Sequence, residues 1–174
     1  MGNKQKFVDF VVEWCNDDSH GYSQANRWGP DCDCSSLMYM AARAAGYDVP
    51  ASGTRYTGTM LNHFQAAGFK AARFDGNLYD CPPASIALNV THHVEAFVDW
   101  GRLGGAHIDE HGGVQGCCQG DQTGNEVSVG PAYTPSYGWD YILLPPDDTE
   151  WSGDHNAVAP VNLPMPRYRV WTRE

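Results

Sequence analysis

Residues Asp31–Ala42, DCDCSSLMYMAA, join a loop rich in Gly, Pro and Asp to an apolar helical pattern. Apolar residues recur at helical spacing as far as Ala44, and Gly46 stops the pattern as a glycine after a helix C-terminus does. Asp33 is suited to cap this helix, which places Cys34 in its first turn. The positive end of the helix dipole there favours a thiolate. The stretch therefore predicts either a nucleophilic cysteine or a small buried cysteine that begins a helix.

The composition is that of one globular domain with a short extension. The 174 residues are 42% apolar and 18% charged, which is enough to bury a core and unlike a disordered chain. No apolar run reaches about 18 residues, so no transmembrane helix and no membrane partner are expected. The net charge of −10 argues against a nucleic-acid partner, because phosphate backbones select basic surfaces. We expect a monomer.

The ends of the chain indicate how it is organised. Residues 1–10 lack the apolar region and cleavage site of a secretory signal, so none is expected. Residues 147–162 are polar and contain proline, which is typical of a linker. Arg167–Trp171 then resembles the start of a further strand. The expected division is a main domain over residues 1–146, then a linker and the start of a truncated C-terminal region over 147–174.

Six cysteines are too few for a disulfide scaffold in a chain of this length. The pair Cys32 and Cys34 and the adjacent pair Cys117 and Cys118 do not have the spacing of a zinc module. Free thiols are therefore expected. A disulfide among Cys32, Cys81, Cys117 and Cys118 stays open as an alternative.

Helical patterns come first in the chain and strand patterns follow. Helices are expected over residues 4–16, 34–45 and 57–67, and residues 69–83 look irregular. Strands are expected over residues 85–90, 93–99, 106–109, 126–129 and 139–144. The connections between strands are too short for parallel crossovers. The sequence therefore predicts an α+β fold with an antiparallel sheet of about five strands.

A cysteine nucleophile needs a base within hydrogen-bond reach. The best candidates are the adjacent His92 and His93 in the stretch Thr91–Val98, THHVEAFV. Strand alternation places the two rings on opposite faces, so only one can reach the Cys34 helix. Two histidines at a strand start, downstream of a capped cysteine, favour catalysis over a structural role.

These motifs resemble the NlpC/P60 and CHAP group of cysteine peptidases. The resemblance rests on Asp33–Ser36 (DCSS), on Tyr22 and on His93–Val98 (HVEAFV), and it covers about residues 4–145. It is nearest to the phage-lysin branch called bacteriophage peptidoglycan hydrolases, amidase type 5. Further similar stretches are Ala66–Phe69 (AAGF), Ile108–Gly113 (IDEHGG), Gly120–Val127 (GDQTGNEV) and Trp139–Tyr141 (WDY).

The resemblance implies a papain-like core in which the cysteine helix packs on an antiparallel sheet. It implies that Cys34 is the nucleophile and His93 the base. Tyr22 would stand beside the thiolate, although a core or loop aromatic is the alternative. Backbone N–H groups at the helix start, flanked by Asp33 and Ser35, would hold the oxyanion. No metal and no cofactor are required.

The residue that orients the base is left open by the sequence. NlpC/P60 enzymes often use a histidine one strand later, which favours His107. CHAP enzymes often use a glutamate, which favours Glu110, although Gly112 stands where they have an asparagine. Asp109 ranks lower. Glu95 shares a face with the base and is expected either to touch substrate or to be a solvated carboxylate at a strand edge.

The activity implied is that of a phage endolysin that degrades bacterial peptidoglycan. The favoured bond is the D,L stem-peptide bond from γ-D-glutamate to the diamino acid. The alternative is the amide between N-acetylmuramic acid and L-alanine. The catalytic domain would span residues 1–146, and a cell-wall-binding region would follow the linker. Such a lysin would accumulate in the host cytoplasm, be released to the wall through a holin pore and cause cytolysis.

Two other classes of function remain open. One is a degenerate cell-wall-binding module, for which 6 Trp and 9 Tyr residues would supply a sugar platform. The other is a redox or metal-binding protein that uses Cys32, Cys34, Cys117 and Cys118. The pairing of Cys34 with a histidine strand favours the hydrolase over both.

Overall fold

The computed structural model of the protein describes residues 3–146. Three helices come first: α1 Asn3–Asn16, α2 Cys34–Ala45 and α3 Thr57–Ala66. Six strands follow: β1 Lys70–Arg73, β2 Ile86–Asn89, β3 His93–Asp99, β4 Arg102–Ala106, β5 Val127–Pro131 and β6 Tyr141–Leu144. The expected linker and C-terminal region, residues 147–174, lie outside the described residues.

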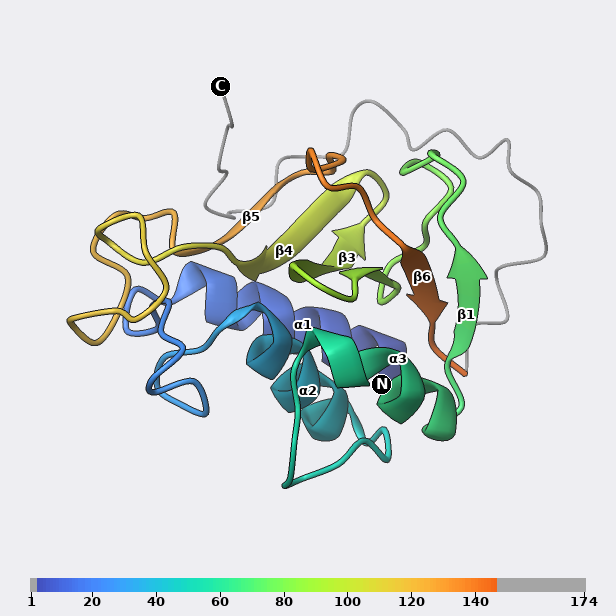
Figure 1. The fold of residues 1–174 in the computed structure, drawn as a ribbon, viewed down its shortest axis with the longest axis horizontal. Coiled ribbons are helices and arrows are strands. Elements are labelled where there is room, and N and C mark those ends of the chain that lie inside the picture. Colours follow the sequence, from blue (N-terminus) through green and yellow to red (C-terminus); the bar gives the residue numbers. More distant parts are fainter. Residues whose placement is uncertain (1–2, 147–174) are drawn as a thin grey trace.

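The strands form one sheet in the order β1-β6-β2-β3-β4-β5, and every neighbouring pair is antiparallel. Figure 1 shows the helices gathered on one side of this sheet. The predicted α+β fold is confirmed, and the arrangement is consistent with a papain-like core. The three helices lie within one residue of their predicted bounds.

The helices and the sheet enclose the main core. Helix α1 contributes Phe7 and Val11, and α2 contributes Leu37 and Met38, all fully buried. Burying side chains of this size is worth about 1.5–3 kcal/mol each, which makes this contact the main stabilising layer. No helix within residues 3–146 has the length and apolar character needed to cross a lipid bilayer.

Strand β3 divides its side chains between two environments. Val94 packs into the main core on the helix side of the sheet. Phe97 faces the other way and joins a second, smaller core cluster with Leu103. Because alternate residues share a face, His93 and Glu95 lie on the same side of β3 as Phe97. His93 is the first residue of the strand, at the end of the sheet nearest the start of α2.

The third predicted strand was wrong in its position. Strand β4 ends at Ala106, whereas the sequence predicted a strand that begins there. Gly104 and Gly105 stand before the predicted strand, but both lie inside β4, at positions where a side chain would not fit. A Cβ on Gly104 would approach Val11 Cγ1 to 2.9 Å, and one on Gly105 would approach Glu95 Cγ to 2.7 Å. Residues 107–110 therefore follow the strand, and strand alternation does not govern them.

Strand β1 was missed because its sequence carries a weak signal. Its four residues, KAAR, are exposed or half-buried and lack alternation. It is an edge strand, and it is held by pairing with β6, from Lys70 opposite Leu144 to Arg73 opposite Tyr141. That partner lies about 70 residues along the chain, so no local pattern predicts the pairing.

Candidate active site

The start of α2 is fixed by a complete capping box. Asp33 has the extended backbone of an N-cap, and its Oδ1 accepts the N–H of Ser36 at 2.7 Å. The Ser36 hydroxyl in turn accepts the N–H of Asp33 at 2.9 Å. These two bonds satisfy donors that a helix start leaves free. They set the direction in which Cys34, the first residue of the helix, presents its thiol.

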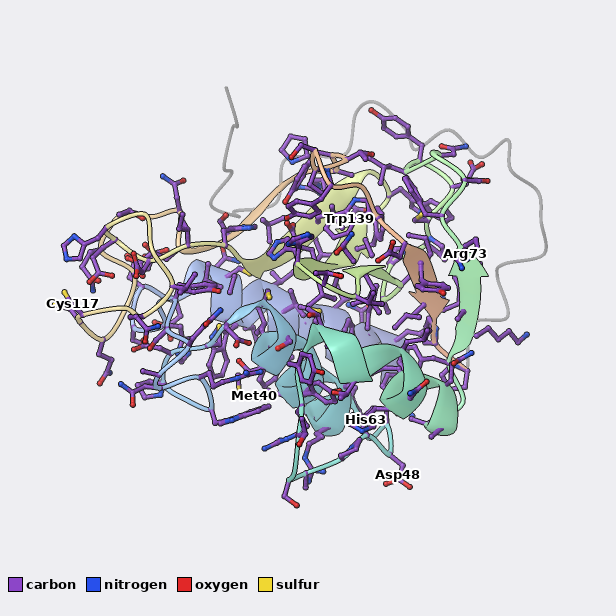
Figure 2. The ribbon with its side chains drawn as sticks, in the orientation of Figure 1. Met40, Asp48, His63, Arg73, Cys117 and Trp139 are labelled. Carbon is purple, nitrogen blue, oxygen red and sulfur yellow. The ribbon has the colours of Figure 1, made fainter. Side chains whose placement is uncertain are left out.

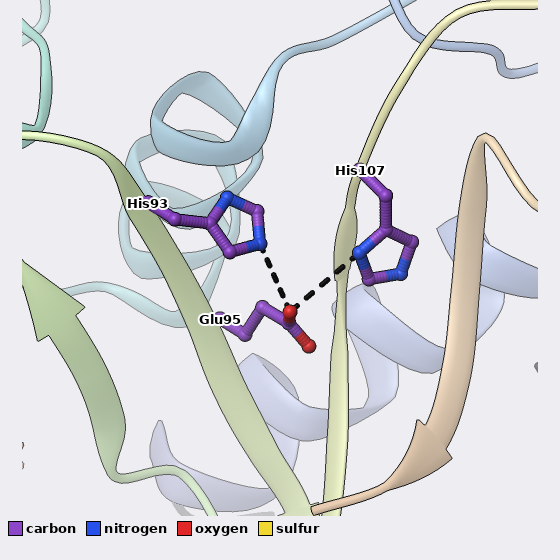
Figure 3. Close-up of side chains that lie close together, drawn as sticks. All are labelled: His93, Glu95 and His107. Carbon is purple, nitrogen blue, oxygen red and sulfur yellow. Dashed lines mark hydrogen bonds and ion pairs between the residues drawn. The ribbon is translucent and has the colours of Figure 1, made fainter. Parts of the chain in front are cut away.

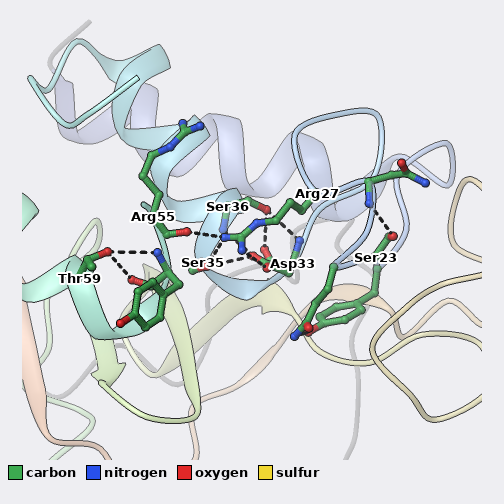
Figure 4. Close-up of polar contacts among 11 residues, drawn as sticks. Ser23, Arg27, Asp33, Ser35, Ser36, Arg55 and Thr59 are labelled. Atoms are coloured by element: carbon green, nitrogen blue, oxygen red, sulfur yellow. Dashed lines mark hydrogen bonds and ion pairs between the residues drawn. The ribbon is translucent and has the colours of Figure 1, made fainter. Parts of the chain in front are cut away.

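An arginine neutralises the capping carboxylate. Arg27 Nη1 lies 3.1 Å from Asp33 Oδ2, and Nη2 donates to Ser35 Oγ at 2.7 Å and to the Arg55 carbonyl at 2.8 Å (Figure 4). A bare carboxylate next to Cys34 would oppose a thiolate. With the guanidinium attached, Asp33 can cap the helix while its charge is offset. Asp33 and Ser35 thus help to hold the start of α2 in place.

Of the two thiols in the motif, only Cys34 is placed to react. Cys32 is fully buried, and burial raises the pKa of its thiol well above the ordinary range, so it stays protonated. Cys34, the first residue of α2, is 8% exposed. Tyr22 is buried near Cys34, and burial first and the nearby Cys34 second raise the pKa of the Tyr22 phenol.

His93 meets Cys34 on one side and Glu95 on the other. Its Nε2 lies 2.9 Å from Glu95 Oε1, and its ring also hydrogen-bonds with the Cys34 side chain. Since Glu95 occupies Nε2, the nitrogen left for Cys34 is Nδ1. Burial by itself lowers the pKa of His93, but the hydrogen bonds and charges of Cys34 and Glu95 raise it from 6.5 to about 9. The ring is therefore an imidazolium at neutral pH.

Glu95 is a buried carboxylate held between two imidazoles (Figure 3). Its Oε1 lies 3.5 Å from His107 Nδ1 and also accepts the Tyr133 hydroxyl. Burial raises the pKa of Glu95, but the charges and hydrogen bonds of His107 and His93 outweigh it and hold the pKa well below the ordinary range. An ionised carboxylate at this depth is stabilised only by such partners.

An aromatic ring packs on the face of the His93 imidazole. Trp139 stacks on His93 with ring centroids 6.0 Å apart and an interplanar angle of 24°. Its indole N–H donates to the Tyr133 carbonyl at 2.8 Å, which fixes the ring in place. Both His93 and Glu95 are buried, and the low local dielectric strengthens the attraction between them.

The sequence-predicted residues fall into two groups in space. Cys34, His93 and Tyr22 lie together, and His107 joins them through Glu95 while its Nε2 contacts Ser128 Oγ at 3.1 Å. Glu110 lies elsewhere: its Oε1 accepts the N–H of Cys117 at 2.8 Å, inside the loop between β4 and β5.

Asp109 also belongs to that loop. Its carboxylate accepts the N–H groups of His111, Gly113 and Gly116 at 2.6–3.0 Å. A carboxylate committed to three backbone donors shapes the loop and has no contact with His93. Asp109 is thus a turn-forming residue.

Glu95 makes the contact with His93 that the sequence ranking sought in His107 and Glu110. Strand alternation put it on the face of His93, and a glutamate two residues from a catalytic histidine has the reach to bond its ring. Tyr133 and Trp139 could not be found in the same way, because they come from the segment before β6. His93, Glu95 and His107 also present ligand atoms within 4.8 Å of one another, a set that could hold a metal ion.

Comparison with known protein families gives a match, and it falls on the last part of the described chain. The model of the endolysin-like domain matches residues 103–154, which include β4, β5, β6, His107 and Tyr133. No curated protein matches the chain. The match covers less than a third of the chain and does not include Cys34, His93 or Glu95, so it is a similarity of this part of the chain to an endolysin-like domain.

Proposed function

We propose that this protein is a peptidoglycan hydrolase that cleaves an amide of the stem peptide with Cys34 as nucleophile. The observation that carries the proposal is the chain of contacts from Cys34 to His93 to Glu95 at the start of a capped helix. A nucleophile, a base and a group that orients the base are the three parts that such chemistry requires. The endolysin-like match supports the substrate.

The mechanism follows from the roles of these groups. The Cys34 thiolate, paired with protonated His93, attacks the amide carbonyl and forms a tetrahedral oxyanion. Backbone N–H groups at the start of α2 stabilise that charge. As the C–N bond breaks, His93 gives its proton to the leaving amine and a thioester remains on Cys34. His93 then takes a proton from water, whose hydroxyl attacks the thioester, and loss of the sulfur frees the acyl product as a carboxylic acid and restores the thiolate–imidazolium pair.

Glu95 is the proposed positioning residue. Its carboxylate on Nε2 fixes the ring so that Nδ1 faces the sulfur, and it stabilises the imidazolium that the mechanism uses. His107 and Tyr133 hold Glu95 in turn. His107, one of the two candidates for the direct partner of the base, is therefore proposed to act one contact further away.

The pH profile reports this arrangement. Because the pKa of His93 is raised to about 9, the imidazolium persists below that pH and is lost above it. We expect kcat/KM for wall fragments to fall as pH rises through about 9. In Glu95→Gln the anion that raises this pKa is gone, so the falling limb should move to lower pH. An unshifted limb in that variant would show that Glu95 has only a structural role.

Gly105→Ala tests the position of Glu95 without changing any polar group. The new Cβ would lie 2.7 Å from Glu95 Cγ, so the carboxylate must move. A misplacement of about 1 Å in a catalytic group costs about 100-fold in rate, and we expect a loss of that order in kcat/KM. Gly104→Ala is the matched control, because its Cβ meets Val11 on the opposite face. It should lower stability by about 1–3 kcal/mol and leave folded-state activity largely intact. Equal activity losses in the two variants would contradict the assignment.

The bond that is cut can be read from the fragments released. We favour the D,L bond between γ-D-glutamate and the diamino acid, and the muramoyl-L-alanine amide is the alternative. Mass spectrometry of digested walls separates them. Endopeptidase action exposes the α-amino group of the diamino acid on released peptides. Amidase action exposes the amino group of L-alanine and leaves peptide-free glycans. Binding to walls with no fragment released would support a binding module.

A further inference from the structure

The loop between β4 and β5, residues 107–126, carries a second cluster of reactive side chains. The loop is long and without regular structure, and it packs on residues 18–31, which lead into the capped helix. Ser23 Oγ donates to the Gln115 carbonyl at 2.7 Å, and Asp31 Oδ1 accepts the N–H of Gly120 at 2.9 Å. A cavity of ≈ 210 Å³ opens between the two segments and is lined by Cys117 and Cys118. Figure 2 shows Cys117 at the left-hand end of the molecule, away from Trp139.

Three side chains in this loop point their ligand atoms at one another. The sulfurs of Cys117 and Cys118 are 2.8 Å apart, and both thiols are exposed. The Glu110 carboxylate stands over them, with Oε1 bonded to the N–H of Cys117. All three ligand atoms lie within 4.8 Å of one another. His111 Nε2 is 3.8 Å from Glu110 Oε1 on an exposed side chain.

Glu110 supplies an independent sign that something binds here. Its side chain is only 8% exposed, and its second oxygen, Oε2, is buried and meets no backbone or side-chain N–H or O–H donor among residues 3–146. The neighbouring Cys117 thiol is a weak donor, and a buried carboxylate that has only such a donor on one oxygen is costly. The groups next to it are two thiols and an imidazole that are all suited to binding metal. A cation between Glu110 and the sulfurs would satisfy this oxygen better than a thiol does.

We propose that Glu110, Cys117 and Cys118 bind a thiophilic divalent cation of the Zn²⁺ class. Two thiolates and a carboxylate are ligands that Zn²⁺ accepts, and the soft sulfurs select against Mg²⁺ and Ca²⁺. His111 lies within reach of the fourth position. On binding, the two thiols release their protons to solvent, and three negative ligands then face one dication.

The geometry needs only a small adjustment. Zn–S bonds of about 2.3 Å in a tetrahedral site separate two sulfurs by about 3.8 Å. The sulfurs of Cys117 and Cys118 must therefore part by about 1 Å, starting from 2.8 Å. Both side chains are exposed, so rotation about their Cα–Cβ bonds can provide this.

The metal would act as a clip on the loop and would take no part in the chemistry at Cys34. It would join Glu110 to two residues seven and eight positions later and close a turn of the loop. Since this loop packs on residues 18–31, the clip would steady the segment that leads to the Asp33 cap. The expected consequence is resistance to unfolding, because a ligand that binds only the folded state stabilises it.

The test is a titration of the full chain with Cd²⁺ and Co²⁺ under a phosphine reductant. It is run in Cys34→Ala, so that the catalytic thiol cannot bind metal. We expect one cation per chain, thiolate-to-metal charge-transfer absorption and a higher unfolding temperature. Adding Glu110→Gln should weaken binding by about tenfold or more, and Cys117→Ser with Cys118→Ser should abolish the absorption.

Asp121→Asn is the matched control for Glu110→Gln. It removes a carboxylate from the same loop, while its Oδ1 can still accept the N–H of Gly124. Metal affinity in this control should equal that of the parent. The proposal is overturned if no stoichiometric metal binds, if the thiolate absorption survives loss of both cysteines, or if Asp121→Asn weakens binding as much as Glu110→Gln.

Discussion

Cys34→Ala should abolish the release of soluble fragments from purified walls, with a loss of about 10⁴- to 10⁶-fold in kcat. In the proposed mechanism the sulfur is the atom that forms the acyl intermediate, and no neighbouring side chain can replace it. Cys34 is the first residue of α2, held by the Asp33–Ser36 capping box, and it contacts His93. The cap does not depend on the thiol. The variant should therefore keep its helical circular dichroism and its unfolding temperature.

Cys32→Ala is the matched control for this experiment. Cys32 lies two residues earlier in the same motif but is fully buried, and its raised pKa keeps it a thiol. Its loss creates a small core cavity and leaves the site intact, so activity of the folded fraction should persist. Undiminished lysis by Cys34→Ala, or equal loss in both variants, would contradict the assignment of the nucleophile.

His93→Gln should lower kcat by about 100- to 10,000-fold, the range that a general acid–base catalyst contributes. Glutamine can still contact Glu95 but cannot carry the proton from Cys34 to the leaving amine. The effect should fall on kcat more than on KM, because the ring acts on the reacting bond. Steady-state kinetics with a defined muropeptide separates the two parameters.

The adjacent histidine provides the control. His92 is exposed and stacks on Tyr137 with ring centroids 4.7 Å apart, on the other side of the strand start from Glu95. His92→Gln should retain nearly full activity. A greater loss in His92→Gln than in His93→Gln would reverse the assignment of the base.

The helices were predictable because their signals are local. The Asp33 cap, the apolar spacing of α2 and the closing Gly46 lie within fifteen residues, and the structure confirms each of them. The Gly46 backbone has φ 94°, in the left-handed region that glycine adopts at no steric cost. Nothing distant needs to be known to place these features.

The sheet was harder to predict where contacts between residues far apart in the sequence decide the structure. Gly104 and Gly105 stood outside the predicted strand, yet they lie inside β4, where Val11 and Glu95 leave no room for a side chain above and below them. That reason becomes visible only when α1 and β3 are packed against β4. Strand β1 exists through its pairing with β6.

The candidate site shows the same division. Two motifs predicted that Cys34 pairs with His92 or His93, and the family resemblance selected His93; the contact between Cys34 and His93 in the structure supports that pairing. The partner of the base was sought one strand later, where family patterns put it. Glu95 was already on the right face, but its burial, its contact with His107 and its shelter by Trp139 depend on the assembled sheet. Glu110 does not reach His93, because it lies in the loop that the hydrogen bonds of Asp109 shape, and its carboxylate binds the N–H of Cys117 there.

The most direct test of the account is alkylation of Cys34 measured against residual activity. The exposed thiols are first removed by Cys117→Ser and Cys118→Ser, so that iodoacetamide reports on Cys34, and labelling is located by peptide mass spectrometry. The account predicts that wall hydrolysis falls in proportion to the labelled fraction of Cys34, that substrate fragments slow the labelling, and that a chelator has no effect on hydrolysis. Full activity with Cys34 fully alkylated, or loss of activity to the chelator with Cys34 unlabelled, would contradict it and favour metal chemistry at His93, Glu95 and His107.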